Sequence, residues 1–218
     1  MDFISVSQQL AIGMITTIEL FLLTLILSLP LGLGVAFCRM SKNGLVRGIT
    51  NIYISIMRGT PLMLQLLVVY FGPYLIFGIT ISSSYRFPAA LIAFVINYAA
   101  YFAEIYRGGI ESMEVGQYEA AQVLGFSKTQ TFFKIILPQV IKRILPSITN
   151  EIITLVKDTS LAYAIAVTEM FTLAKQIAAS EATMMPYFVA GVFYYIFNFI
   201  VAFGMEKVEE KFGYYTNK

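Results

Sequence analysis

Four polar residues interrupt an otherwise apolar stretch, NEIITLVKDTSLAYAIAV, which begins with Asn150 and Glu151 and continues to Lys157 and Asp158. A lone charge at the centre of a bilayer costs about 2.5–3.5 kcal/mol, so charges in a span commonly have a functional reason. Glu151 and Asp158 are seven residues apart and nearly share a helix face, as do Asn150 and Lys157. Adjacent Lys157 and Asp158 partly neutralise each other, and a zwitterionic ligand would use both signs. We favour this binding role over a buried ion pair that only fixes helix register.

A second polar stripe lies in INYAAYFAEIYRGGI, where Asn97, Tyr101 and Glu104 follow one another at intervals of four and three residues. This spacing places them on one helix face, which we expect to face protein or water rather than lipid. Asn97 could equally bond a neighbouring helix, and Tyr101 could be packing. For Glu104 we expect an ion pair with Arg107, one turn along the helix.

The segment RGTPLMLQ predicts a break in a helix. Pro61 cannot donate a backbone hydrogen bond but suits the first position of a helix, with Thr60 before it as the capping residue. A helix that restarts here would direct its positive end into the bundle, toward an anionic group such as a carboxylate. The alternative is that Arg58 reaches to the headgroups and Pro61 only kinks the helix.

The elements that hold these residues must be membrane helices, because 58% of the 218 residues are hydrophobic and only 13% are charged. We predict an all-α membrane protein, a single domain over residues 1–218. The N-terminal MDFISVSQQL has no Lys or Arg, so the first apolar run is expected to be a helix rather than a signal peptide. Pro30, Gly32 and Gly34 predict a kink or a tight helix contact within it. The expected transmembrane helices are five, at about 9–38, 48–72, 87–107, 147–175 and 184–205.

Basic residues predict the orientation. Arg39, Lys42 and Arg47 follow the first helix, whereas the loop after the second helix has no charge before Arg86. Because cytoplasmic loops carry the excess of Lys and Arg, the first loop is predicted to be cytoplasmic and the N-terminus to lie outside. The interval 108–146 and the C-terminal tail, with Lys207, Lys211 and Lys218, then lie inside.

The interval 108–146 predicts a structured docking element. Helix formers alternate there with Gly125, Pro138 and Pro146, which we interpret as breaks between short helices. Ala120 and Ala121 would let another surface approach closely. The apolar anchors would be Phe126, Phe132 and Phe133. An amphipathic helix lying on the membrane surface is the alternative.

The same interval contains the pattern E-A-A, three residues, G, nine residues, I-x-L-P. It resembles the transmembrane subunits of binding-protein-dependent ABC importers, whose matching loop forms coupling helices in a groove of the ATP-binding subunit. The resemblance implies a permease of the bacterial cytoplasmic membrane with two ATP-binding subunits, a second permease that is identical or related, and an extracytoplasmic binding protein. The matching residues are Glu119, Ala120, Ala121, Gly125, Ile135, Leu137 and Pro138.

Two further motifs resemble the amino-acid branch of these importers. One is RGTP followed by Gln65, and the other is Asn150-Glu151 followed by Lys157, Asp158 and Ser160. The likeness implies a polar amino acid as substrate, although it does not say which one. The residues that it places along the path, together with the stripe at Asn97, give the expected substrate-binding set: Arg58, Gly59, Thr60, Asn97, Tyr101, Glu151, Lys157 and Asp158.

Several chemistries are absent from the sequence. No G-x-x-x-x-G-K-[ST] loop occurs, so ATP-Mg is expected in a separate ATPase and no cofactor in this chain. The chain has no histidine, which removes imidazole as a metal ligand, and Cys38 is its only cysteine. A net charge of +2 reports loop orientation rather than nucleic-acid binding. The alternatives are an ion-coupled secondary transporter or channel and, third, a membrane enzyme that uses Glu104, Glu151 and Asp158.

Overall fold

The structure is a computed structural model that describes residues 2–212, and these residues form helices and turns without a strand. Three irregular pieces are the 3₁₀ turns η1 (Ser83–Tyr85) and η3 (Thr159–Ile165) and the π-helical turn η2 (Phe132–Ile136). The α-helices are α1 (Phe3–Arg39), α2 (Gly44–Gly59), α3 (Leu62–Phe77), α4 (Arg86–Glu111), α5 (Val115–Val123), α6 (Lys128–Thr131), α7 (Leu137–Asp158), α8 (Met170–Ser180) and α9 (Met185–Phe212). The expected helices over 9–38, 87–107 and 184–205 correspond to α1, α4 and α9. Lys218 lies outside the described residues.

Among the described helices, three spans are long and apolar enough to cross a membrane by length and mean hydropathy: α1, η1 with α4, and α9. The pair α2 and α3 forms a fourth, broken span, bent by 111°. The α7 helix, which carries Glu151, Lys157 and Asp158, is not among these spans. Hydropathy alone therefore supports three to four spans.

Among the described elements, α1 and α4 make the most extensive contact, and Gly32 allows their close approach. A Cβ atom on Gly32 would lie 2.8 Å from the Phe102 Cβ and 3.0 Å from the Ala99 carbonyl oxygen, whereas Gly34 has nothing within 4 Å. Because α1 continues through Pro30 without a break, the predicted feature is a tight helix contact made by Gly32.

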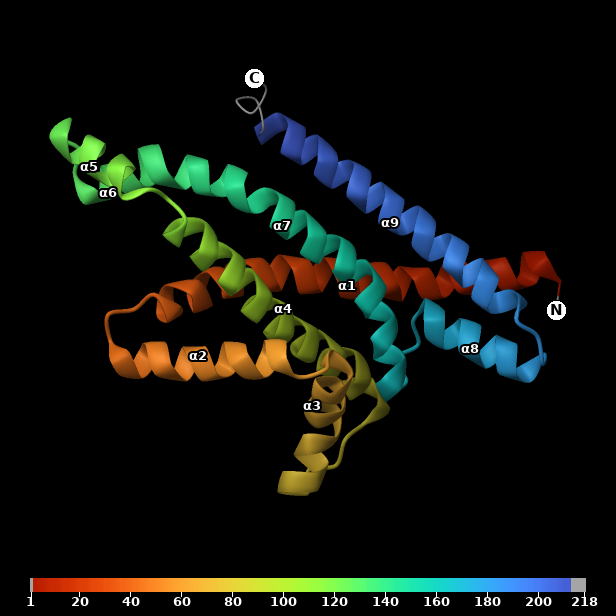
Figure 1. The fold of residues 1–218 in the computed structure, drawn as a ribbon. Coiled ribbons are helices and arrows are strands. Elements are labelled where there is room, and N and C mark those ends of the chain that lie inside the picture. The colour runs from red at the N-terminus through yellow and green to blue at the C-terminus, as the bar shows by residue number, and fades with distance from the viewer. Residues whose placement is uncertain (1, 213–218) are drawn as a thin grey trace.

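The predicted break in the second helix is confirmed. The α2 helix ends at Gly59, and α3 starts at Leu62 in a different direction (Figure 1). The expected capping role of Thr60 is wrong, because its hydroxyl donates to the Ile56 carbonyl of α2 at 2.8 Å. Pro61 occupies the N-cap position of α3, with no side-chain capping bond.

The expected helix over 147–175 is wrong at its start and in its continuity. It begins at Leu137, because Pro138 lies in the first turn, where its missing N–H costs no hydrogen bond, and Pro146 is accommodated inside α7. The α7 helix stops at Asp158 and continues as η3 to Ala166, whose φ is +54°. The α8 helix then begins at the N-cap Glu169, a buried residue that the sequence reading did not single out.

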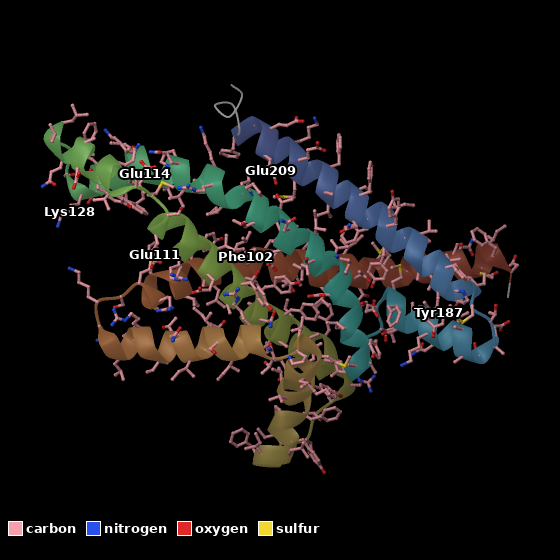
Figure 2. The ribbon with its side chains drawn as sticks, viewed as in Figure 1. Phe102, Glu111, Glu114, Lys128, Tyr187 and Glu209 are labelled. Carbon is pink, nitrogen blue, oxygen red and sulfur yellow. The ribbon has the colours of Figure 1, made fainter. Side chains whose placement is uncertain are left out.

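The interval between α4 and α7 folds back on itself as predicted at Gly125, whose φ of +78° suits a residue without a side chain. The Phe126 N–H donates to the Ala121 carbonyl at 3.0 Å and so closes the end of α5. Glu114 and Lys128 of this segment lie at one end of the molecule, and Tyr187 near α8 lies at the other (Figure 2). The α4 and α7 helices both extend from the α5–α6 segment toward the middle of the molecule, where α4 lies beside α3 and α7 leads on to α8 (Figure 1).

The Gly32 contact predicts that Gly32→Leu destabilises the protein, whereas Gly34→Leu is tolerated. Extra side-chain volume in a close-packed contact costs about 1–3 kcal/mol. Thermal unfolding of the purified chain in detergent measures both variants, and equal midpoints for the two would contradict the assigned contact.

Candidate functional site

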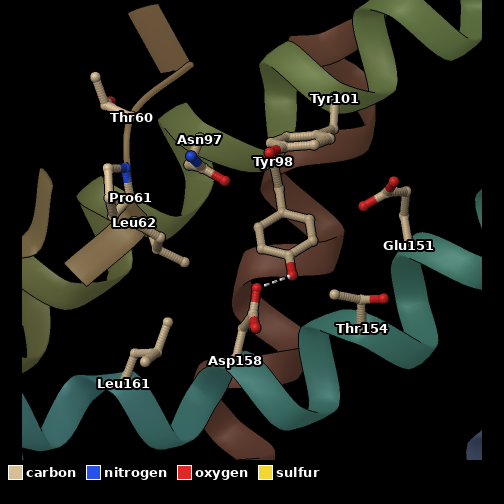
Figure 3. A pocket seen from close by; sticks show the side chains of 10 residues that line it. All are labelled: Thr60, Pro61, Leu62, Asn97, Tyr98, Tyr101, Glu151, Thr154, Asp158 and Leu161. Carbon is tan, nitrogen blue, oxygen red and sulfur yellow. Dashed lines mark hydrogen bonds between the residues drawn. The ribbon is translucent and has the colours of Figure 1, made fainter. Parts of the chain in front are cut away.

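A cavity of about 370 Å³ lies where the α2–α3 break, the middle of α4 and the C-terminal half of α7 meet (Figure 3). The break, α4 and α7 each contribute polar side chains to the lining of this cavity. On α7, Glu151, Thr154 and Asp158 follow helical spacing and point the same way. The remaining lining residues are Thr60, Pro61, Leu62, Asn97, Tyr98, Tyr101 and Leu161.

The structure brings together many, though not all, of the expected site residues. Thr60, Asn97, Tyr101, Glu151 and Asp158 line this cavity. The lining does not include Arg58 or Gly59, which end α2 just before the break, or Lys157.

Lys157 and Asp158 are close enough for their charges to offset each other in part, but their side chains enter different cavities. Neighbouring residues of an α-helix point about 100° apart, so Lys157 leaves the cavity that Asp158 enters. Lys157 lines a separate cavity of about 270 Å³ together with Ser160, Phe171 and Gly191. No ion pair joins Lys157 to Asp158 within residues 2–212.

Asp158 instead contacts α4. The Tyr98 hydroxyl donates to the Asp158 carboxylate, Oη to Oδ2, at 2.7 Å (Figure 3). Tyr98 is almost fully buried, so its hydroxyl needs a partner there. This bond links two helices that are sixty residues apart in sequence.

Arg58 lies behind the cavity wall and belongs to a cluster around Glu104. The expected Glu104–Arg107 pair is confirmed, with Nη2 2.7 Å from Oε2. The Glu104 carboxylate also lies 3.7 Å from the Arg58 guanidinium and 3.8 Å from that of Arg39. The Arg58 guanidinium is 5.4 Å from the centre of the Tyr101 ring, whose side chain lines the cavity.

Two amides hold the α2–α3 break. The last carbonyls of a helix have no partner within it. The Gln65 amide nitrogen donates to the carbonyls of Met57 (3.1 Å) and Thr60 (3.2 Å) and to the Thr60 hydroxyl (2.8 Å). The Asn97 nitrogen donates to the Met57 carbonyl (3.0 Å) and to Oε1 of Gln65 (2.9 Å). Both N–H groups of Asn97 are therefore occupied, and its carbonyl oxygen remains for the cavity (Figure 3).

Residues 28–214 match the family described as the binding-protein-dependent transport system inner membrane component. The chain belongs to this family. The L-cystine transport system permease protein TcyB of Bacillus subtilis is 36% identical over 208 residues, 94% of this chain and 87% of that protein. The arginine transport system permease protein ArtQ of the same organism is 36% identical over 200 residues, 91% of this chain and 90% of that protein.

A crystal structure of an amino acid ABC transporter with histidines matches with a TM-score of 0.87 and 31% identity, covering 97% of this chain and 99% of that one. The MetNI methionine ABC transporter, at 18% identity and a TM-score of 0.70 over 97% and 99% of the two chains, shares the fold. The resemblance to permeases of amino acid ABC importers is thus confirmed. The permease is a multi-pass inner-membrane protein of a family that works in transport rather than catalysis.

Sequence reasoning missed two polar residues of the permease cavity. Thr154 lies between Glu151 and Asp158 on the same face, so helical spacing alone could have included it. Tyr98 follows Asn97 directly, and only the position of α7 shows that its hydroxyl reaches Asp158.

The break predicts that Gln65→Leu destabilises the permease by about 1–3 kcal/mol, because it leaves acceptors of Met57 and Thr60 without their donor. Gln176→Leu, an exposed position on α8, is the matched control. Thermal unfolding in detergent compares the two variants. Equal stability would mean that the Gln65 bonds do not hold the break.

Proposed function

We propose that this permease forms the path of an ATP-driven importer for polar amino acids and that the cavity at the α2–α3 break is its substrate site. The observation that carries the proposal is the cavity itself. It lies between membrane helices, and its wall combines the Glu151 and Asp158 carboxylates, the free Asn97 oxygen and the N-terminal end of α3. Broken helices that present an N-terminus inside a bundle are a recurring way to bind a substrate carboxylate.

The charges favour an amino acid with a cationic side chain. Two carboxylates and no Lys or Arg line the cavity. In a low-dielectric site the carboxylates of Glu151 and Asp158 would attract ammonium or guanidinium groups. The substrate α-carboxylate would face the N-terminus of α3, with Arg58 adding positive potential from behind Tyr101. The relative ArtQ is named as an arginine transport system permease, so the family accommodates this choice.

The expected substrate-binding set divides into three roles under this proposal. Thr60, Asn97, Tyr101, Glu151 and Asp158 contact the substrate. Arg58 and Gly59 shape the break and its potential. Lys157, which faces another cavity, does not contact the substrate.

Coupling to a separate ATPase is proposed for α5 and the turn that follows it. The α5 end exposes apolar side chains that no described residue covers, including Val123 (87% exposed) and Leu124 (74%). Glu119, Ala120 and Gly125 are exposed beside them and would enter the ATPase groove. Ala121 is buried, so it would hold α5 in place instead of contacting the partner.

The proposed assembly has two ATP-binding subunits that bind ATP-Mg, a second permease and an extracytoplasmic amino-acid-binding protein. ATP binding draws the ATPase subunits together, the Glu119–Gly125 element passes the motion on, and the bundle opens outward.

Five spans are proposed: α1, α2–α3, α4, α7 with η3 and α8, and α9. The α7 span is included because Glu151 and Asp158 face the cavity rather than lipid. From the distribution of basic residues we propose that α5, α6 and the C-terminus lie inside and the N-terminus outside.

Gly125→Val tests the coupling. Valine at a φ of +78° is strained, so the turn after α5 should shift. In the complex purified with its co-expressed ATPase and reconstituted with binding protein, we expect ATP hydrolysis to persist while uptake falls at least about tenfold. Gly108→Val, which meets no atom within 4 Å, is the control. A permease that purifies alone and transports with an ion gradient would support the secondary-transporter alternative instead.

Asp158→Asn tests the substrate site. The change keeps the shape but removes one of two carboxylates, and a hydrogen bond to a charged group is worth about 1.5–3 kcal/mol. Equilibrium binding of radiolabelled arginine to the purified complex, without binding protein, should weaken at least about tenfold, and binding of glutamine should change little. Glu206→Gln, exposed on α9, is the control. Equal losses for arginine and glutamine would contradict the proposed charge selectivity.

A further inference from the structure

A second polar cavity, of about 460 Å³, lies at the end of α4 opposite to α5, where η1, the η3–α8 connection and α1 meet. We infer that this outer cavity binds a carboxylate, and specifically the α-carboxylate of the amino acid before it reaches the central cavity. The identity of the ligand rests on the proposed transport function. The outer cavity is lined by Thr16, Ser83, Ser84, Arg86, Phe87, Ala166, Val167 and Thr168.

Arg86 is the only charged residue in this lining, and its hydrogen-bonding capacity is largely unused. Its Nε is buried and has no acceptor. Its Nη1 reaches the Ala166 carbonyl only at 3.5 Å. A guanidinium carries five N–H donors, and a buried donor without an acceptor is unfavourable, so an acceptor from outside the described chain would be stabilised here.

No acidic residue within 2–212 forms an ion pair with Arg86. The buried Glu169 carboxylate accepts bonds from the Phe171 N–H (2.7 Å), from the Thr172 N–H (2.6 Å) and hydroxyl (2.9 Å), and from the Tyr194 hydroxyl (3.1 Å). Glu19 is exposed one turn along α1 from Thr16 and makes no ion pair with Arg86 within 4 Å. Among the residues that line the outer cavity, Arg86 is therefore the only one with a formal charge, and that charge is positive.

The chemistry of the wall selects a carboxylate. The planar guanidinium fork of Arg86 matches the two oxygens of a carboxylate, and the hydroxyls of Ser83 and Thr168 can donate to the same group. The Ser84 hydroxyl instead donates to the Ser82 hydroxyl at 3.1 Å. The central cavity has the opposite charge, with two carboxylates and no basic residue in its lining. The carboxylate of an amino acid is attracted to the outer cavity, and its ammonium group is attracted to the central cavity.

The two cavities adjoin one short piece of chain. Leu161 of η3 lines the central cavity, and Ala166 at its end lines the outer one. Between them Ala162 and Ile165 are buried in the core, so the direct route is closed in this structure. A substrate that arrives from outside would be held at Arg86 until η3 moves.

An acidic side chain of the binding protein is a second source of a carboxylate, and cysteine labelling distinguishes the two. The assembled complex in nanodiscs carries Cys38→Ser, which removes the only cysteine, and Ser84→Cys beside Arg86. The measurement is the alkylation rate with a sulfonate-bearing and with an ammonium-bearing thiosulfonate of similar size. Retained ATPase activity verifies that each variant is assembled.

We expect the anionic reagent to react faster, and Arg86→Gln to lower the anionic-to-cationic rate ratio about tenfold. Arg86→Lys should keep most of the preference, and Glu19→Gln should keep or raise it. Free arginine should slow the labelling when Arg86 is present, and arginine amide, which lacks the carboxylate, should not. In Asp158→Asn, free arginine should still slow the labelling. A failure of the proposed central site can therefore be distinguished from a failure of the proposed outer site.

Protection by ligand-free binding protein, without protection by free arginine, would overturn the substrate assignment and identify a docking contact. An unchanged rate ratio in Arg86→Gln would overturn the anion site itself. Protection by arginine amide equal to that by arginine would also overturn it, because the carboxylate would then play no part.

Discussion

The structure depends on how backbone groups are satisfied where a helix breaks inside a membrane bundle. Lipid offers no hydrogen bonds, so an interrupted span survives only if other groups of the protein replace the lost partners. At the α2–α3 break, Gln65 and Asn97 do this for the carbonyls of Met57 and Thr60. Because Asn97 belongs to α4, the same bonds fix the break against the helix that forms the cavity wall.

The cavity follows from this arrangement together with the placement of charge. Glu104 gathers the guanidiniums of Arg39, Arg58 and Arg107 into one cluster, away from the cavity lining. Glu151 and Asp158 remain on the wall, and Asp158 is held by Tyr98. The cavity is therefore acidic although the chain as a whole carries a net charge of +2.

The α7 helix links the α5–α6 segment to the two cavities. It begins beside the α5–α6 segment, runs past the cavity and ends at Asp158, where η3 continues toward the outer cavity. The connection after it is irregular, with Ala166 in the left-handed region and the buried Glu169 closing the start of α8. A helix that contacts both ends, followed by a connection that can change conformation, suits a protein whose two faces must open in turn.

The sequence by itself determined the features that depend on neighbouring residues. The apolar runs require membrane helices, Pro61 favours a break, and Gly125 permits a left-handed turn. Glu104 finds Arg107 one turn away, and Glu151 shares a face with Asp158. Each of these follows from helical periodicity or from the limits of one backbone position.

Only the tertiary structure decided the features that depend on distant contacts. It used the Asn97 amide to hold α2, brought the Tyr98 hydroxyl to α7 and left Arg86 without an ion pair to any residue within 2–212. It also joined residues on both sides of Pro146 into one helix, where the sequence suggested a boundary. Spacing along a helix shows which residues share a face, but the neighbour of that face is set by packing between helices that are far apart in the chain.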